Sequence, residues 1–251
     1  MEETVKRALG EWRAKLRTPL FADITRTLEV TCYTSGKNNH GSNFIGNLVV
    51  LVAIETIAQF LVDYDKEAFD AEVKKAQREI GALFKKPLSN FFTPRQSPNG
   101  GSGSDFAVQF LRDYMGQVDQ KYADADVAKR LWRFRNPHAH AFYPFVDDTS
   151  SLRGSVLWLY RKKRKRVGLR IGKLEKGLKR GKFARKLEKH LAVIADRAGM
   201  SSFVSIPQIL FVHLRQAVDL YEATVIRDRS VGDIFVKNYT RLSRAYDFAT
   251  L

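Results

Sequence analysis

The sequence predicts a mainly α protein, a helical bundle with a small inserted basic β-hairpin and additional C-terminal helices. Over most of the chain, apolar residues recur every three or four positions, which places them on one face of a helix. One interior segment instead holds two short β-prone runs separated by a basic turn, a pattern typical of a hairpin. With 251 residues, 44% of them hydrophobic, the chain can bury a core without disulfides or metal ions.

The N-terminal stretch is predicted to supply the centre of the bundle. Glu2–Thr34 has helical spacing of its apolar residues, and Pro19 is expected to kink this helix or divide it in two. After a polar loop, a second helix is predicted at Phe44–Tyr64, with Ser42 or Asn43 as its cap. The first half of that helix is apolar nearly all round, which predicts burial among other helices.

The predicted hairpin divides the rest of the chain. Its strands are Ser155–Tyr160 and Arg166–Ile171. Further helices are predicted at Lys66–Lys86, Asp105–Lys121, Ala123–Arg135, Lys182–Ala198, Pro207–Arg227 and Asp233–Asp247. The predicted organisation is therefore a bundle core over residues 1–150, a basic hairpin insertion over 151–181, and C-terminal helices over 182–251 that pack on the same domain.

Positive charge is concentrated in one part of the chain. The formal net charge is +16, and Arg161–Lys189 holds fifteen Lys or Arg against two Glu, a net charge of +13. This exceeds what solubility requires, so we expect a polyanionic partner rather than an ordinary solvated face. Cations at a hairpin tip would neutralise phosphates in a salt-dependent way without reading bases. The candidate nucleic-acid-binding residues are Arg161, Lys162, Lys163, Arg164, Lys165, Arg166 and Arg170.

The sequence also bears on compartment and cofactors. The charged start, Met1–Arg17, lacks the apolar core of a signal peptide, and the apolar run Leu48–Ile54 is too short for a membrane span. Cys32 is the lone cysteine, which suits a reducing compartment. We therefore expect a cytoplasmic protein that does not cross a membrane. Because no zinc-site spacing or phosphate loop is present, neither a metal nor a cofactor is expected.

A short segment, Arg135-Asn136-Pro137-His138-Ala139-His140, carries the residue types that RNA cleavage needs. Cleavage without a metal requires a base that takes the ribose 2′-OH proton, a cation at the phosphate, and an acid that protonates the departing 5′-oxygen. Histidine can act as acid or base near neutral pH, because its unperturbed pKa is about 6.5. Arginine brings a permanent charge and a planar fork that matches phosphate oxygens.

This segment resembles the signature of HEPN domains (higher eukaryotes and prokaryotes nucleotide-binding), in which an arginine and a polar residue are followed, after three residues, by a histidine. The resemblance implies a helical bundle that acts, in many members, as a metal-independent endoribonuclease in toxin–antitoxin or phage-defence systems. It implies that Arg135 holds the scissile phosphate, that His140 is the acid or base, and that Asn136 has a positioning role. Because the motifs of two protomers meet at a dimer interface in that family, the implied partners are RNA, a second copy of the chain and an antitoxin protein.

Several alternatives stay open. Arg133 and His138 have the same spacing, so they form either a second register or supporting residues, and Pro137 should distort a helix through the motif. The histidines could instead be surface residues after a helix end, with the arginines favouring its C-terminal dipole. Glu55, inside the apolar helix, could orient a motif arginine, although a solvent-facing or structural carboxylate is the simpler expectation. The rival functions are non-catalytic nucleic-acid binding through the basic hairpin and attachment to an anionic membrane surface.

Overall fold

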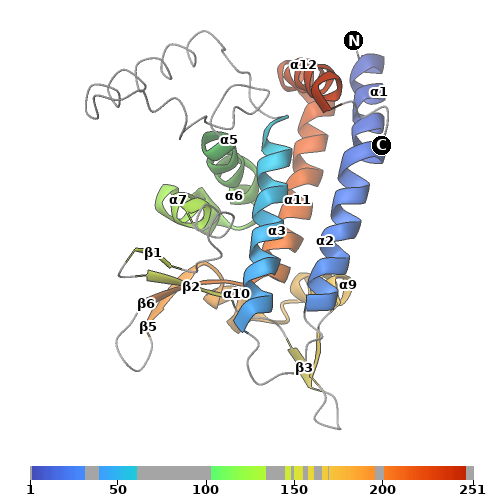
Figure 1. The fold of residues 1–251 in the computed structure, drawn as a ribbon. Helices are drawn as coiled ribbons and strands as arrows, with labels where there is room; N and C mark the ends of the chain where they lie inside the picture. The colour runs from blue at the N-terminus through green and yellow to red at the C-terminus, as the bar shows by residue number, and fades with distance from the viewer. Residues whose placement is uncertain are drawn as a thin grey trace, which may run out of the picture.

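The computed structural model of this protein describes residues 2–31, 40–60, 103–133, 145–147, 150–154, 158–160, 166–168, 170–195 and 201–246. Over these residues the protein is mainly α, as predicted, and two small sheets lie at one end of its helical bundle (Figure 1). The predicted helix Lys66–Lys86 and the segment 135–140 lie outside the described residues.

The helical elements differ in their hydrogen bonding. Two short stretches, η1 and η3, are π-helical, and η4 is a 3-10 turn. In chain order the elements are α1 (Glu2–Trp12), η1 (Arg13–Arg17), α2 (Thr18–Thr31), α3 (His40–Ala58), α5 (Gly103–Phe110), η3 (Leu111–Met115), α6 (Gly116–Val118), η4 (Gln120–Ala123), α7 (Ala125–Arg133), α9 (Ile171–Lys179), α10 (Ala184–Lys189), α11 (Pro207–Arg227) and α12 (Arg229–Tyr246).

Helix α11 is the element around which the others pack. It contacts α1, α3, η3, α9 and α12, and every residue from Pro207 to Leu214 is buried. Its observed bounds are those predicted from the sequence, because a proline at its first position and a long periodic apolar pattern mark it clearly. The prediction of this C-terminal helix is confirmed.

The N-terminal stretch is helical from Glu2 to Thr31, and the interruption predicted at Pro19 lies just before that residue, where the π-turn η1 separates α1 from α2 (Figure 1). The irregularity is the π-turn η1, where the Thr18 N–H donates to the Arg13 carbonyl. In an uninterrupted α-helix, Trp12 and Ile24 would face directions about 120° apart. The extra residue absorbed by a π-turn reduces this to about 20°. Both side chains are therefore fully buried in one core.

Helix α3 is buried as predicted, but its bounds are not those expected. It begins at His40, so Ser42 and Asn43 lie inside it and neither is its cap. It ends at Ala58, six residues before the predicted end. There the Phe60 carbonyl accepts hydrogen bonds from the Tyr221 hydroxyl (3.0 Å) and the Asn238 amide (3.2 Å). These two contacts provide hydrogen-bond donors for a backbone carbonyl just beyond the end of α3.

Aspartate caps set two helix boundaries that differ from those predicted. Asp124 accepts hydrogen bonds from the N–H groups of Asp126 and Val127, so α7 begins at Ala125 rather than Ala123. Asp228 does the same for Ser230 and Val231, and α12 begins at Arg229, four residues before the expected start. A side-chain acceptor at this position replaces a missing intrahelical partner.

The predicted hairpin is present, and a second sheet was missed. Strands β3 (Trp158–Tyr160) and β4 (Arg166–Gly168) pair antiparallel, but Ile171, predicted as the end of the second strand, begins the helix α9 instead. The missed sheet has the order β1-β2-β6-β5, with β2 and β6 parallel and the other pairs antiparallel. Its strands are β1 (Phe145–Asp147), β2 (Ser150–Gly154), β5 (Ala192–Ala195) and β6 (Ser201–Ser205).

Strand β5 contradicts the predicted helix Lys182–Ala198. The helical part, α10, ends at Lys189, and Leu191 then adopts a left-handed conformation with φ 61°. The helix has already ended at the extended backbone of His190, and the β-branched residues that follow Leu191 pair with β6. A span of membrane-crossing length and apolarity is not found among the helices that the structure describes.

Candidate nucleic-acid interface

The best-defined charged surface lies on α9, α10 and the turn between them. Nine exposed cations occupy this stretch and the residue directly before it, and we call this surface the basic corner: Arg170, Lys173, Lys176, Lys179, Arg180, Lys182, Arg185, Lys186 and Lys189. Two carboxylates share it. Glu175 is partly buried and pairs with Lys179 (3.5 Å) and Arg215 (3.3 Å), whereas Glu188 is exposed. The surface therefore keeps a large positive excess.

A tight turn holds the two helices of the basic corner together. The Lys182 N–H donates to the Gly177 carbonyl, and the Gly181 N–H to the Leu178 carbonyl, both at 2.9 Å. This is a Schellman motif, and Gly181 has the positive φ of 68° that it requires. A side chain at Gly177 would place its Cβ 2.5 Å from the ring of Phe183. The glycine thus allows a close contact between α9 and the start of α10.

The inner side of α9 attaches the basic corner to the bundle. Ile171 and Leu174 are buried, and α9 contacts α11. The ion pair between Arg215 of α11 and Glu175 of α9 adds a polar link at the same contact. Apolar burial of this kind fixes the helix, since each fully buried aliphatic side chain contributes about 2 kcal/mol.

Lys121 of η4 fixes the end of α10. Its ammonium group donates to the carbonyls of Leu187 (2.8 Å), Glu188 (3.0 Å) and His190 (3.0 Å). The last carbonyls of a helix have no intrahelical partner and carry its negative dipole end, so a cation is favourable there. Lys121 consequently holds α10 against the bundle with all three of its N–H donors.

A buried chain of hydrogen bonds continues from this point. The Ile206 N–H donates to His190 Nδ1 (3.1 Å), so a neutral His190 carries its proton on Nε2 and donates it to Tyr122 Oη (2.8 Å). The Tyr122 hydroxyl then donates to His213 Nδ1 (3.2 Å). Geometry therefore determines both tautomers, and the chain links η4, α11 and the segment after α10.

The surroundings keep these groups uncharged at neutral pH. Burial, the neighbouring His213 and then Lys121 hold the pKa of His190 well below its ordinary value. Burial lowers the pKa of His213 to about 4, although Asp119 opposes this shift. Burial also raises the pKa of the Tyr122 hydroxyl well above its usual range. The chain is thus built for support rather than for proton transfer near pH 7.

The structure places only some of the predicted site residues. Arg166 begins β4, Arg170 is exposed directly before α9, and Glu55 is partly buried on α3. Arg133 is the last residue of α7. The others lie outside the described residues: Arg135, Asn136, His138, His140, Arg161, Lys162, Lys163, Arg164 and Lys165. The pairing of Glu55 with a motif arginine therefore stays a prediction.

Sequence reasoning missed the residues that support the basic corner. Lys121 and His190 are 69 positions apart, so no local pattern joins them. One signal was present in the sequence. His190 and His213 each stand beside apolar runs, and an isolated histidine in such a setting indicates a buried hydrogen-bonded side chain.

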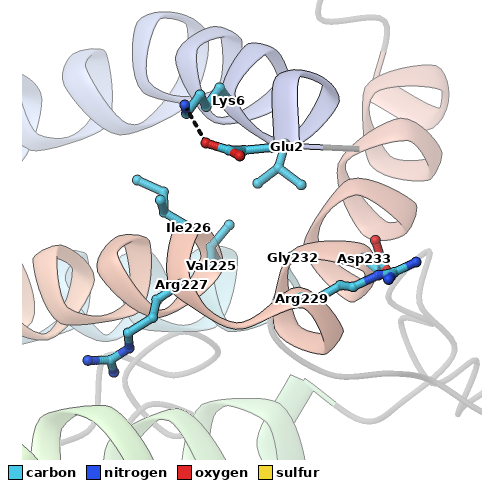
Figure 2. A pocket seen from close by; sticks show the side chains of 9 residues that line it. Glu2, Lys6, Val225, Ile226, Arg227, Arg229, Gly232 and Asp233 are labelled. Atoms are coloured by element: carbon cyan, nitrogen blue, oxygen red, sulfur yellow. Dashed lines mark hydrogen bonds and ion pairs between the residues drawn. The ribbon is translucent and has the colours of Figure 1, made fainter.

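A separate hollow lies at the opposite end of the bundle, between the start of α1 and the junction of α11 with α12 (Figures 1 and 2). Its volume is about 290 Å³, with Val5, Val225 and Ile226 among its lining residues. Charges of both signs surround it, including a Glu2–Lys6 ion pair (2.6 Å) that Figure 2 shows at its rim. It is therefore unsuited to a polyanion. Within the described residues, no group of three or more His, Cys, Asp or Glu could hold a metal ion.

Comparisons with known proteins add no relative to this picture. No protein-family model, curated protein or solved structure has significant similarity to this chain.

Proposed function

We propose that this protein acts on RNA and holds the RNA backbone on the basic corner. The observation that carries the proposal is the set of nine exposed cations on a rigidly supported pair of helices, where Glu175, the less exposed of the two carboxylates, is paired. Such a surface binds phosphates through charge and the release of counterions, without base readout. The hairpin β3–β4 belongs to the same basic stretch of the chain, so its cations add to this surface in our proposal.

We further propose that the protein cleaves RNA as a metal-independent endoribonuclease of the HEPN type. Two facts support this: the Arg135-to-His140 motif itself, and the helix that leads to it. In α7, Ala128, Leu131 and Trp132 are buried, so the chain is firmly anchored just before the motif. Arg135 would hold the scissile phosphate, His140 would be acid or base, and Asn136 would position one of them.

The biological setting of the proposal follows from the family resemblance. It comprises a homodimer with one composite cleft, a toxin–antitoxin or phage-defence role, an antitoxin partner and a cytoplasmic location. Arg133 and His138 are supporting residues in this proposal.

Cleavage is tested with purified protein and total RNA in EDTA, beside the Arg135→Ala/His140→Ala double variant. We expect the parent alone to cut, leaving 2′,3′-cyclic phosphate ends, because the 2′-oxygen is the nucleophile. Equal cutting by both proteins would remove the motif from the mechanism.

Non-catalytic RNA binding is the second candidate, because the basic corner is complete without the motif. Changing Lys182, Arg185, Lys186 and Lys189 to Gln removes four exposed cations from it. The matched control changes four exposed cations elsewhere to Gln: Arg7, Lys15, Arg112 and Lys129. RNA binding lost only in the first variant, with no cutting by the parent, would support this second candidate. Equal loss of binding in both variants would contradict a localised interface.

A further inference from the structure

The exposed cations of the basic corner form two rows, one on each of its helices. Because an α-helix turns about 100° per residue, Lys173, Lys176 and Lys179 of α9 lie within an arc of about 120°. The buried Ile171 and Leu174 lie on the opposite side of that helix. At a rise of about 1.5 Å per residue, the row is about 9 Å long. It therefore faces away from the bundle along most of α9.

The second row lies on α10. Arg185, Lys186 and Lys189 lie within an arc of about 100°, and this row is about 6 Å long. Arg180 and Lys182 lie between the two helices and continue the positive charge from one row to the other. Two rows that are joined in this way can contact two lines of phosphate groups at once.

The two rows are fixed relative to each other. The Schellman motif that ends at Lys182 closes the turn between them, and the ring of Phe183 lies against Gly177. Lys121 holds the far end of α10 through three carbonyl groups. A surface that is ordered in advance binds most tightly to a ligand that is also ordered, because neither partner then loses conformational freedom.

The aromatic rings of the basic corner are already in contact with the protein. Proteins that bind single strands add aromatic side chains on which unpaired bases stack. Over residues 170–190, all of which the structure describes, the aromatic rings are those of Phe183 and His190. Phe183 is partly buried against Gly177, and His190 is completely buried and hydrogen-bonded to Tyr122. Affinity for RNA must therefore come from contacts with phosphates.

We infer that the RNA held on the basic corner is double-stranded, and that the two rows contact the phosphates of its paired strands. This inference rests on the proposed function and names the class of RNA that the same surface binds. A duplex keeps two lines of phosphates at a fixed separation, and proteins recognise double-stranded RNA mostly by its shape and backbone. A duplex also releases more counterions per contact, since the slope of log K against log salt is about −0.9 per phosphate for B-form DNA and about −0.7 for a single strand.

The test compares the Kd of a labelled RNA duplex of about 16 base pairs with the Kd of one of its strands, chosen so that it does not pair with itself. At about 0.15 M salt, we expect the parent protein to bind the duplex about tenfold more tightly, which is the factor that the two slopes give for about six contacts relative to 1 M salt. The single strand should still bind through the same cations.

The number of phosphates sets the threshold for this comparison. A duplex carries twice the phosphates of one strand, which by itself accounts for about a twofold difference in Kd. A difference of about twofold or less would overturn the inference. Absence of binding to both RNAs would instead remove the proposed function.

The two four-Gln variants show whether the basic corner causes the preference. The variant that changes Lys182, Arg185, Lys186 and Lys189 removes the row on α10, and we expect its ratio of single-strand to duplex Kd to fall to about threefold or less. The control at Arg7, Lys15, Arg112 and Lys129 should keep the ratio of the parent. An unchanged ratio in both variants would place the preference elsewhere and overturn the inference.

A substitution at Gly177 tests the fixed arrangement without removing a cation. Gly177→Ala places a Cβ 2.5 Å from the ring of Phe183, so the start of α10 must shift. We expect the Kd for the duplex to rise about threefold or more and the Kd for the flexible strand to change less. Gly172→Ala is the control, since its Cβ meets nothing within 4 Å. Thermal unfolding verifies that both variants fold, and an unchanged duplex Kd in a folded Gly177→Ala protein would contradict the role of the fixed rows.

Discussion

The two halves of α11 bury polar groups in opposite ways. Near its C-terminal end, Glu222 is 4% exposed and accepts hydrogen bonds from Arg13 (2.8 Å) and Arg17 (2.7 Å) of η1. Near its N-terminal end, His213 is held neutral in a chain with Tyr122 and His190. One end keeps a charge with its counter-charges, and the other keeps polarity without charge.

The difference follows from the groups that surround each end of α11. The Glu222 carboxylate connects α11 to the π-turn η1. Because η1 supplies Arg13 and Arg17, two positive charges compensate for the burial of this negative charge. The imidazoles lie beneath the basic corner and beside Lys121, where another positive charge would be repelled. A neutral chain supports a cationic surface without adding to its self-repulsion. The two ends should therefore respond differently to pH and to substitution.

Acid should produce the largest effect, and it should act at the histidine end. Between pH 6.5 and the lowered folded pKa values, the unfolded chain binds protons that the folded protein excludes, so stability falls as pH falls. At pH 5 the loss from His213, whose folded pKa is about 4, should be about 2 kcal/mol, and His190 should add to this loss in the same direction. Urea unfolding at pH 7, 6 and 5 measures it.

A substitution at His213 identifies which groups cause the fall in stability with falling pH. The variant His213→Gln keeps a hydrogen-bond acceptor near Tyr122 but cannot titrate. About half of the pH dependence of the free energy of unfolding should therefore disappear. If the variant and the parent lose the same free energy of unfolding between pH 7 and 5, other groups cause the acid sensitivity.

Removing the charge at the other end should have a smaller effect. Glu222→Gln leaves Arg13 and Arg17 facing a neutral amide, and we expect a loss of about 2 kcal/mol in the free energy of unfolding, below the range for fully buried pairs because Arg13 is 44% exposed. Asp219→Asn is the control, since that carboxylate is 63% exposed and its pairing with Arg17 should contribute under about 1 kcal/mol. Equal losses in urea unfolding would show that burial does not distinguish the two carboxylates.

The smallest expected effect concerns the turn of the basic corner. Gly181 has a φ of 68°, so in Gly181→Ala an alanine must adopt the left-handed backbone conformation. This should lower the free energy of unfolding by about 1 kcal/mol. Gly172→Ala is the matched control in α9, where an added Cβ meets nothing within 4 Å and should be neutral or slightly stabilising. Thermal unfolding of both variants checks this, and a Gly181→Ala protein as stable as the control would contradict the role given to the turn.

Some of this architecture could be predicted from the sequence, and the reasons differ by element. Helix α11 was predicted with its bounds because its signals are local: a starting proline and a long periodic pattern. The hairpin β3–β4 was found for the same reason. Strand β5 was missed because four residues carry little periodicity, and its pairing with β6 is decided by residues further along the chain.

The candidate site, like the fold, could be predicted only in part. Its cations were visible as composition, whereas the supports of the basic corner were not. Lys121 and Tyr122 gain their roles only when the chain brings them to His190, 69 and 68 residues away. The π-turn η1 likewise brings Trp12 and Ile24 to the same side of the helix, whereas the sequence indicated an interruption only through the presence of Pro19.

The most direct test of the central claim is the salt dependence of RNA affinity. We would measure the Kd of a labelled single-stranded RNA from 50 to 300 mM salt for the parent, the four-Gln variant of the basic corner and the four-Gln control. We expect the corner variant to lower the slope of log K against log salt by up to about 3, and the control to leave it close to that of the parent. Equal slopes for the two variants would contradict the assignment of the basic corner as the RNA-binding surface.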